Sequence, residues 1–172
     1  MIEVRWLITE ELDMWRNDLA DVLEDCVLGG ASVHFMLPFT RKDALHWWDG
    51  CLAGIKAGKG RIFGAIADGK LVGTVQLGLD NPPNQFHKGE IKKMLVHRAF
   101  RRQGLAKQLL EAAEAEARVR RLTLLVLDTN QGSEAEALYV KMGYQRAGVI
   151  PDFAKWPDGR PSAAVFFWKA LT

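Results

Sequence analysis

One short turn, Arg101–Ala106, constrains the fold of this chain more than any other segment. It stands between a run that fits a strand, Glu90–Val96, and a stretch with apolar residues at helical spacing that begins at Leu105. The first backbone N–H groups of a helix have no partner within the helix and carry partial positive charge, so they attract anions. Because Gly104 keeps the turn slim and Lys107 adds a full charge, the segment predicts a phosphate-binding strand–turn–helix.

Apolar periodicity and turn residues divide the rest of the chain into helices and strands. Residues that can cap a helix stand at Thr9, Thr40 and Ser133, and the last two are followed three residues later by an acidic side chain. The dipeptide Asp68-Gly69 fits a tight type I′ turn and predicts a hairpin. The predicted elements are helices from Thr9 to the Gly29-Gly30 pair, from Thr40 to Gly58, from Leu105 to about Val119 and from Ser133 to Met142, and strands Arg61–Ala67, Lys70–Leu77, Lys88–Val96, Leu122–Asp128, Tyr144–Val149 and Ala163–Leu171.

The run Leu122–Asp128 is almost wholly apolar. Such a run predicts a strand buried on both faces, as in a parallel strand–helix–strand unit. Prolines and an Asp-Gly pair between residues 151 and 161 predict a loop before the last strand. No repeat or low-complexity linker interrupts these elements, so we expect residues 1–172 to form a single domain of mixed α/β class.

Composition excludes several classes of protein. A net charge of +2, from 23 basic and 21 acidic residues, is too balanced to predict nucleic-acid binding. The two cysteines, Cys26 and Cys51, form no Cys-x-x-Cys pair and the four histidines are scattered, so no metal site is predicted. No apolar run approaches the ~20 residues that cross a bilayer, and the first residues do not form a secretion leader. We therefore expect a cytoplasmic protein without a membrane partner.

The pattern Arg101-x-x-Gly104-x-Ala106 resembles motif A of the GNAT family of N-acetyltransferases, [Arg/Gln]-x-x-Gly-x-[Gly/Ala], which binds the pyrophosphate of acetyl-CoA. A second similarity starts at Gly132, which stands where the family has Asn; Asn130 is the candidate to replace that contact. It resembles Asn-x-x-Ala-x-x-Leu-Tyr followed by Gly-Phe or Gly-Tyr, here at Ala135, Leu138, Tyr139, Gly143 and Tyr144. The resemblance implies a mostly antiparallel sheet of six or seven strands, splayed at the cofactor site and flanked by four helices.

The same resemblance implies where acetyl-CoA binds. The pantetheine arm pairs with the strand before the turn, the diphosphate rests on the main chain of the turn, and one tyrosine lies near the sulfur. The implied cofactor-binding residues are Met94, Leu95, Val96, Arg101, Arg102, Gln103, Gly104, Leu105, Ala106, Lys107, Asn130 and Tyr139.

Within the family, four segments resemble the tabtoxin-resistance type of acetyltransferase: Leu124–Thr129, Gly148–Ala154, Pro157–Gly159 and Phe166-Phe167. That subgroup acetylates a small β-lactam amino acid. The resemblance therefore implies a small-molecule acceptor, such as an amino-acid-like toxin, an antibiotic or a metabolite, and a role in resistance. Frequent dimers in the family make a homodimer an expectation by analogy.

Three residues are candidates for the chemistry. An amine with a pKa near ~10 must lose its proton before it attacks, and Glu90 and Asp128 are the candidate acceptors of that proton. Either carboxylate has a plain structural alternative, Glu90 as a surface acid and Asp128 as a residue that bonds its own backbone. Tyr139 is the candidate donor of a proton to the departing thiolate, with a core aromatic as the alternative.

Four aromatic residues of the early helices are candidates to line the acceptor pocket: Phe35, Phe39, Trp47 and Trp48.

Neither cysteine falls near the cofactor signatures, so we expect direct transfer in a ternary complex without an acyl-enzyme. Two alternatives remain: a protein N-terminal or lysine acetyltransferase, and a non-catalytic acyl-CoA-binding module.

Overall fold

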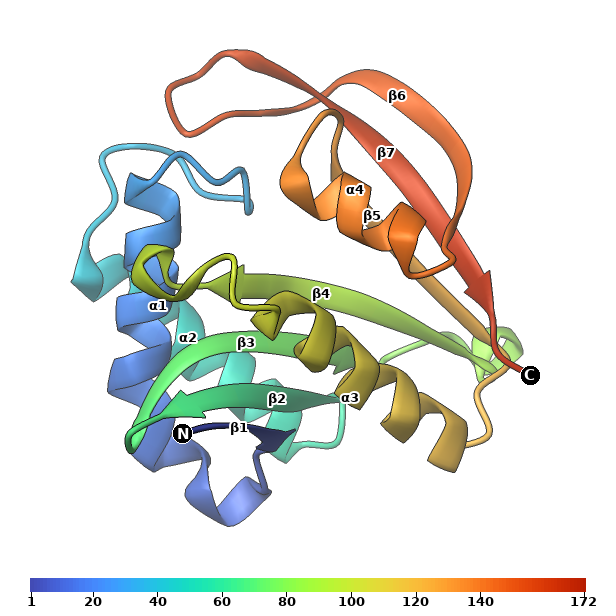
Figure 1. Cartoon of the computed structure of the whole chain (residues 1–172), viewed down its shortest axis with the longest axis horizontal. Coiled ribbons are helices and arrows are strands. Elements are labelled where there is room, and N and C mark those ends of the chain that lie inside the picture. The colour runs from blue at the N-terminus through green and yellow to red at the C-terminus, as the bar shows by residue number, and fades with distance from the viewer.

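A seven-stranded sheet with helices on both faces organises the computed structural model, which describes the whole chain, Met1–Thr172 (Figure 1). The strands follow the order β1-β2-β3-β4-β5-β7-β6, and every neighbouring pair is antiparallel except β4 with β5. The main elements are β1 (Ile2–Trp6), α1 (Arg16–Leu28), α2 (Arg41–Lys56), β2 (Gly60–Ala67), β3 (Lys70–Gly78), β4 (Lys88–Val96), α3 (Leu105–Val119), β5 (Leu124–Asn130), α4 (Glu134–Lys141), β6 (Gln145–Lys155) and β7 (Pro161–Ala170).

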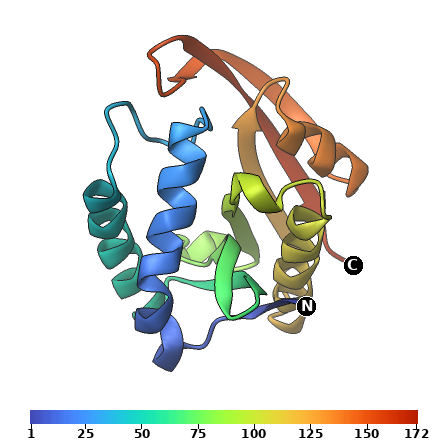
Figure 2. The same ribbon diagram turned by 60° about the vertical axis from the view of Figure 1, so that its left-hand side comes forward.

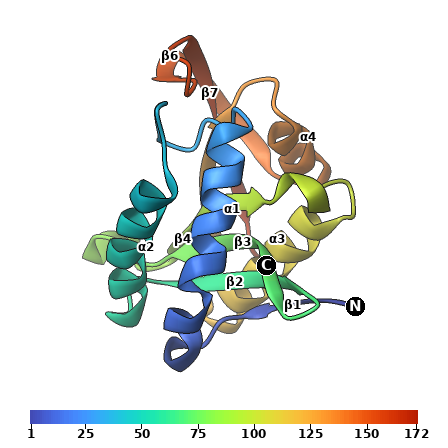
Figure 3. The same cartoon turned by 90° about the vertical axis from the view of Figure 1, so that its left-hand side faces the viewer.

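The helices form a layer on each face of the sheet. Figure 2 shows α1 and α2 on one side of the strands and α3 on the other, and in Figure 3 α1 and α2 come forward. Two cores result, one under α1 and α2 around Leu23 and Trp48, the other under α3 around Leu109 and Phe167. Burial of these apolar side chains is the main force that fixes the helices on the sheet. No helix combines the length and apolar character needed to cross a membrane.

Local signals in the sequence predicted several elements correctly. Asp68 and Gly69 both have positive φ, 47° and 79°, at the tip of the β2–β3 hairpin. At the start of α2, Thr40 Oγ1 accepts from the Asp43 amide at 3.3 Å and the Asp43 carboxylate accepts from the Thr40 amide at 2.8 Å. Ser133 Oγ accepts from the amide three residues on, at 3.1 Å, and caps α4.

Four expectations need correction. Thr9 does not cap the first helix: Ile8 does, at the start of a 3₁₀ turn, because the Glu11 carboxylate accepts from the Ile8 amide at 2.9 Å. Strand β1 was not predicted, because it has no turn signal of its own and pairs with β2, 60 residues away in sequence. β5 is fully buried on one face only, since α1 and α2, on the other face, cover β2, β3 and β4. β6 runs on to Lys155 through the predicted loop, because a sheet edge tolerates a proline and bulges.

Candidate active site

Strands β4 and β5 part within the sheet, and this opening is where the site lies. They pair at three positions only, ending with Glu90 opposite Val126. Beyond Glu90 the second half of β4 has no partner on that side, although β3 still pairs with its other edge. Backbone groups of an unpaired strand edge can bind an extended ligand in place of a strand. The predicted splay is therefore present, and Met94, Leu95 and Val96 stand along it.

A β-bulge turns the middle of β4. The β3–β4 register shifts between Thr74 and Gln76, and Lys93 has a φ of 49°. Without an extra residue Ile91 and Leu95 would share a face, yet Ile91 belongs to the core under α3 and Leu95 to the core under α1 and α2. Glu90, Lys92 and Lys93 consequently all point to the α1–α2 face of the sheet.

The turn after β4 presents free amides. The amides of Arg102 to Lys107 have no hydrogen-bond acceptor in the chain. Arg102 and Gly104 both have positive φ, 62° and 76°, so consecutive N–H groups converge in a concave nest at the N-terminus of α3. Helix dipole and exposed amides together suit a phosphate. The residues present thus fit the diphosphate of a cofactor.

The basic side chains of this turn differ in their availability. Arg102 is exposed and lies 3.7 Å from Glu134, and Lys107 pairs loosely with Glu111 on the next helical turn. Arg101 turns away: its guanidinium donates to Val96 O at 3.1 Å. The structure therefore leaves Arg102 and Lys107 free to meet an anion and gives Arg101 a part in holding the turn.

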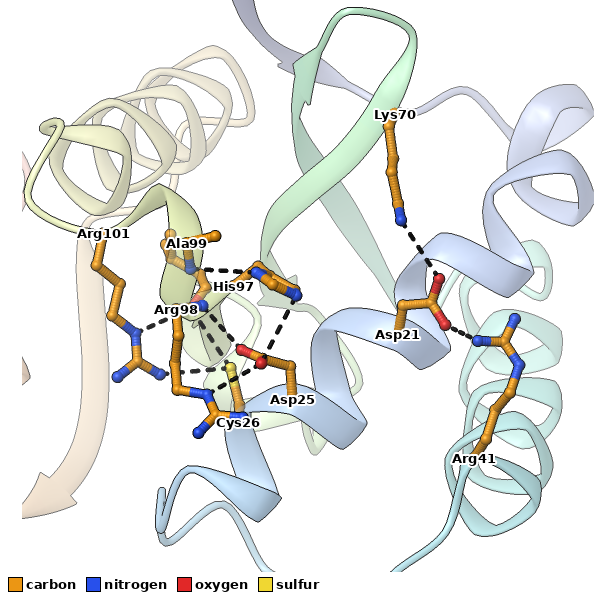
Figure 4. A network of polar contacts seen from close by, with 10 residues as sticks. Asp21, Asp25, Cys26, Arg41, Lys70, His97, Arg98, Ala99 and Arg101 are labelled. Atoms are coloured by element: carbon orange, nitrogen blue, oxygen red, sulfur yellow. Dashed lines mark hydrogen bonds and ion pairs between the residues drawn. The ribbon is translucent and has the colours of Figure 1, made fainter.

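Asp25, near the end of α1, anchors the segment that leads into this turn (Figure 4). Its carboxylate accepts from the Arg98 amide at 2.8 Å and from Arg98 Nε at 2.9 Å, and His97 Nε2 lies 3.6 Å away. Burial alone would raise the pKa of Asp25, but the hydrogen bonds from Arg98 outweigh it and lower the pKa. Helix α1 and the phosphate turn are thus joined by an ionised side chain.

Both candidate bases lie at the opening of the sheet on the α1–α2 face. Glu90 is the last β4 residue paired with β5, and its carboxylate lies 3.7 Å from Lys92 Nζ. Asp128, two residues beyond Val126 on β5, is exposed and has no hydrogen-bond or ion-pair partner in the chain. The structure brings the two carboxylates together on neighbouring strands, and both are accessible.

The charges of both carboxylates act on Lys93, which sequence reasoning missed. Lys93 Nζ donates to Val33 O at 3.2 Å and lies 2.7 Å from His34 Nδ1, with the rings of Phe35 and Trp47 at 5.7 and 5.2 Å. Burial lowers its pKa to about 8, against the opposing charges of the site. The pKa of His34 is also lowered, by burial and by Lys93, so His34 is neutral and can accept. Gly73 of β3 stands beside the register shift, but nothing in the sequence of β4 marks Lys93 as the bulged residue.

Tyr139 lies on α4 against the core under α3. Its side chain is 4% exposed, and its ring meets those of Tyr144 and Phe167 at centroid distances of 5.6 and 6.1 Å. Burial, and then the charge of Asp128, raises the pKa of Tyr139, so it stays a neutral phenol that can donate a hydrogen bond. The hydroxyl makes no hydrogen bond within the chain and remains available.

Asn130 joins the α1–α2 loop to β7, so both ends of its amide are occupied by protein partners. Its amide donates to Ser32 O at 3.1 Å and its oxygen accepts from Ser162 Oγ at 2.7 Å. Two further bonds join the α1–α2 loop to the β6–β7 turn: Ser32 Oγ to Lys155 O at 3.1 Å and the Leu37 amide to Pro157 O at 3.0 Å. Both ends of the Asn130 amide thus hold protein segments together.

Of the four aromatic candidates for a pocket wall, two are core residues. Trp48 and Phe39 are buried under α1 and α2. Trp47 lines a cavity between α2 and the strands, and Phe35 packs edge-on against Trp47 at a centroid distance of 5.7 Å. Of the two neighbouring tryptophans, Trp48 therefore packs in the core and Trp47 faces the cavity.

Fold and site together fit a protein that binds a diphosphate-bearing cofactor at the amide nest, along the opening between β4 and β5. The profile of the Acetyltransferase (GNAT) family matches residues 13–144. This chain belongs to the GNAT family of acetyltransferases and works with acetyl-CoA.

Solved structures agree with this fold. An N-acetyltransferase from Staphylococcus aureus Mu50 superposes with a TM-score of 0.80 at 20% identity, over 100% of this chain and 99% of that one. A Salmonella typhimurium protein, described as an acetyltransferase with its cofactor acetyl-CoA, gives 0.77 at 19%, over 99% and 94%. A ribosomal-protein-alanine N-acetyltransferase from Brucella melitensis gives 0.76 at 22%, over 98% and 99%. Such identities support the fold and leave the acceptor open.

Proposed function

We propose that this acetyltransferase acts on an amine or hydroxyl of a small molecule, such as an amino-acid-like toxin, an antibiotic or a metabolite, with a role in resistance. The observation that carries the proposal is the opening between β4 and β5, with an amide nest at one end and two accessible carboxylates, Glu90 and Asp128, on its wall. Acetyl-CoA supplies the activated acetyl group. The free thiols Cys26 and Cys51 support a cytoplasmic location.

Cofactor binding follows from the backbone of β4 and the turn. The amides of Arg102 to Lys107 hold the diphosphate, with Arg102 and Lys107 as charged partners. The free edge of β4 at Met94–Val96 holds the pantetheine arm. Asn130 serves the site by fixing the α1–α2 loop.

Transfer requires removal of one proton and delivery of another. Glu90 or Asp128 takes the proton of the acceptor amine or hydroxyl, directly or through a water molecule, so that nitrogen or oxygen can attack the thioester carbonyl. An unpaired amide of β4 stabilises the oxygen on which negative charge develops. Tyr139 donates a hydrogen bond to the departing thiolate and passes its proton to the sulfur as a solvent proton replaces it, so no phenolate has to form. The acetyl group moves in one ternary complex, without an acyl-enzyme.

The link between the α1–α2 loop and the β6–β7 turn favours a small molecule over a protein chain. Hydrogen bonds join the α1–α2 loop to the β6–β7 turn through Ser32 with Lys155 and Leu37 with Pro157. A peptide that passed between the α1–α2 loop and the β6–β7 turn would have to break both bonds.

An acceptor screen by thiol release tests the proposal. The panel contains β-lactam amino acids, aminoglycosides, polyamines and peptides with free N-terminal or lysine amines. We expect turnover of a small amine, a fall in kcat of about 100-fold or more in Glu90→Gln or Asp128→Asn, and unchanged CoA affinity in both. Turnover confined to peptides would assign a protein acetyltransferase. CoA binding without turnover of any acceptor would assign an acyl-CoA-binding module.

A further inference from the structure

A cavity of about 550 Å³ extends from the candidate site, between α2 and strands β3 and β4. His34, Trp47 and Lys93 form the end that meets the opening of the sheet, and Lys59 and Asp80 lie among its other lining residues. The volume falls within the range of small-molecule sites. An acceptor held at Glu90 and Asp128 therefore has room for the rest of its structure in this cavity.

The charges of this cavity are predominantly positive. Lys59, Lys92 and Lys93 line it against one carboxylate, Asp80. Asp80 pairs with Lys59 at 3.3 Å, and Lys92 lies 3.7 Å from Glu90 beside the cavity. Lys93 alone has no carboxylate within 4 Å; its polar partners are a carbonyl and a neutral imidazole.

An ammonium group that is largely buried without a paired counter-ion is unfavourable, because burial removes water, and a carbonyl, a neutral imidazole and two aromatic rings replace only part of the lost solvation. The ammonium group of Lys93 lies without a paired carboxylate at the point where the cavity meets the opening of the sheet. A ligand carboxylate beside Lys93 would supply the missing charge and form a charge-assisted hydrogen bond.

We infer that this cavity binds an anionic group of the acceptor, so that the substrate is an amine that also carries a carboxylate, with Lys93 and Lys92 as the residues that select it. The inference rests on the proposed acetyl transfer and narrows its substrate class. The acceptor lies with its amine at Glu90 and Asp128 and its carboxylate at the two lysines. Trp47 and Phe35 flank Lys93 and cover the apolar part of such a molecule. Polyamines, which carry only positive charge, are excluded.

Matched acceptors test the charge requirement. Thiol release is measured for L-amino acids, for their carboxamides and for 1,5-diaminopentane. We expect at least one free acid to exceed its carboxamide in kcat/KM by about 10- to 100-fold, although the amide has the more easily deprotonated amine. Equal or better turnover of the carboxamides or of the diamine would overturn the inference while leaving acetyl transfer intact.

Variants locate the effect. Lys93→Met should raise KM for the acid by about 10-fold or more, with a much smaller change in kcat and no change for the carboxamide. Lys88→Met is the control, because Lys88 lies on the same strand, outside the cavity, bonded to Gln85. An equal rise in KM for acid and carboxamide, or no rise, would contradict a charge-specific role for Lys93.

A binding measurement separates this inference from the proposed function. The CoA complex is titrated by calorimetry with N-acetyl-L-amino acids and with their amides, so turnover is not needed. We expect at least one N-acetyl acid to bind more tightly than its amide in the wild type and in Lys88→Met, and to lose this advantage in Lys93→Met. If no amine is acetylated but this pattern holds, acetyl transfer fails and the anion site stands. If no N-acetyl acid exceeds its amide, the anion site fails.

Discussion

Replacing Gly104 by valine separates the backbone strain of the phosphate turn from its binding function. Gly104 has φ 76° and ψ 8°, a left-handed conformation that costs an L-residue about 1–2 kcal/mol. A Cβ there meets nothing closer than Gln108 Nε2 at 4.0 Å, so the fold itself has room for it. We therefore expect Gly104→Val to fold, with a free energy of unfolding lower by about 2 kcal/mol.

The loss of CoA affinity should be larger than this strain. The added side chain projects into open space beside the free amides of Arg102 to Lys107. Displacing a phosphate from two such amides removes two charge-assisted hydrogen bonds, each worth about 1.5–3 kcal/mol. At about 1.4 kcal/mol for each tenfold change, the Kd for CoA rises by about 100-fold or more.

Calorimetry with CoA and denaturant unfolding measure the two effects, and Gly58→Val is the matched control. Gly58 has φ 84° with nothing within 4 Å of its Cβ position, and it follows α2 away from the turn. Both variants should lose similar stability, and only Gly104→Val should lose CoA affinity. An unchanged Kd in a folded Gly104→Val protein would refute the placement of the diphosphate.

Three further predictions concern other parts of the site. Asp25→Asn should raise the Kd for CoA by about 10-fold, because Arg98 loses an ionic partner, whereas Asp21→Asn on the same helix should leave it unchanged by calorimetry. Tyr139→Phe should lower kcat by about 100-fold at constant KM in thiol-release assays, with little change in stability, since the hydroxyl makes no bond in the chain. Cys26 lies closer to the cofactor turn than expected from the sequence, since its Sγ donates to Val96 O at 3.5 Å. Mass spectrometry after mixing with acetyl-CoA should nevertheless find no acetyl group on Cys26 or Cys51, because burial raises the pKa of both thiols.

The elements that were predicted well depend on neighbours in sequence. The hairpin at Asp68-Gly69, the capping box of Thr40 and Asp43, and the turn at Gly104 each rely on residues within four positions of one another. Their geometry is determined by local sterics and hydrogen bonds, which the sequence specifies directly. The free amides of the turn follow from the same local rules.

The elements that were missed depend on contacts between distant segments. Lys93 reaches the site only because β3 and β4 pair out of register around a bulge. Gly73 stands beside the register shift, but Gly78 and Gly89 lie in the same two strands, so no glycine singles out the bulged residue. The link between the α1–α2 loop and β5 needs Asn130 to meet Ser32, 98 residues away in sequence. The fold could be predicted from its motifs, whereas the arrangement of charges around the acceptor required the assembled sheet.

The environment of Lys93 makes a separate prediction about the folded protein. Its pKa falls from 10.5 to about 8 on folding, through burial, so between these values the unfolded chain binds more protons and stability must rise with pH. Below pH 8 the buried charge of Lys93 lowers the free energy of unfolding by about 3 kcal/mol, and this loss disappears by about pH 10.5. The charged or titratable groups that act on Lys93 are His34, Cys51, Glu90, Lys92 and Asp128. The free energy of unfolding is measured against pH for the wild type and for Lys93→Met. In their difference most other titrations cancel, and the contacts that the variant loses add only a constant. The free energy of unfolding of the wild type should rise relative to that of the variant between pH 8 and 10.5. A constant difference would mean that Lys93 keeps an ordinary pKa, and the argument for an anionic ligand at Lys93 would lose this support.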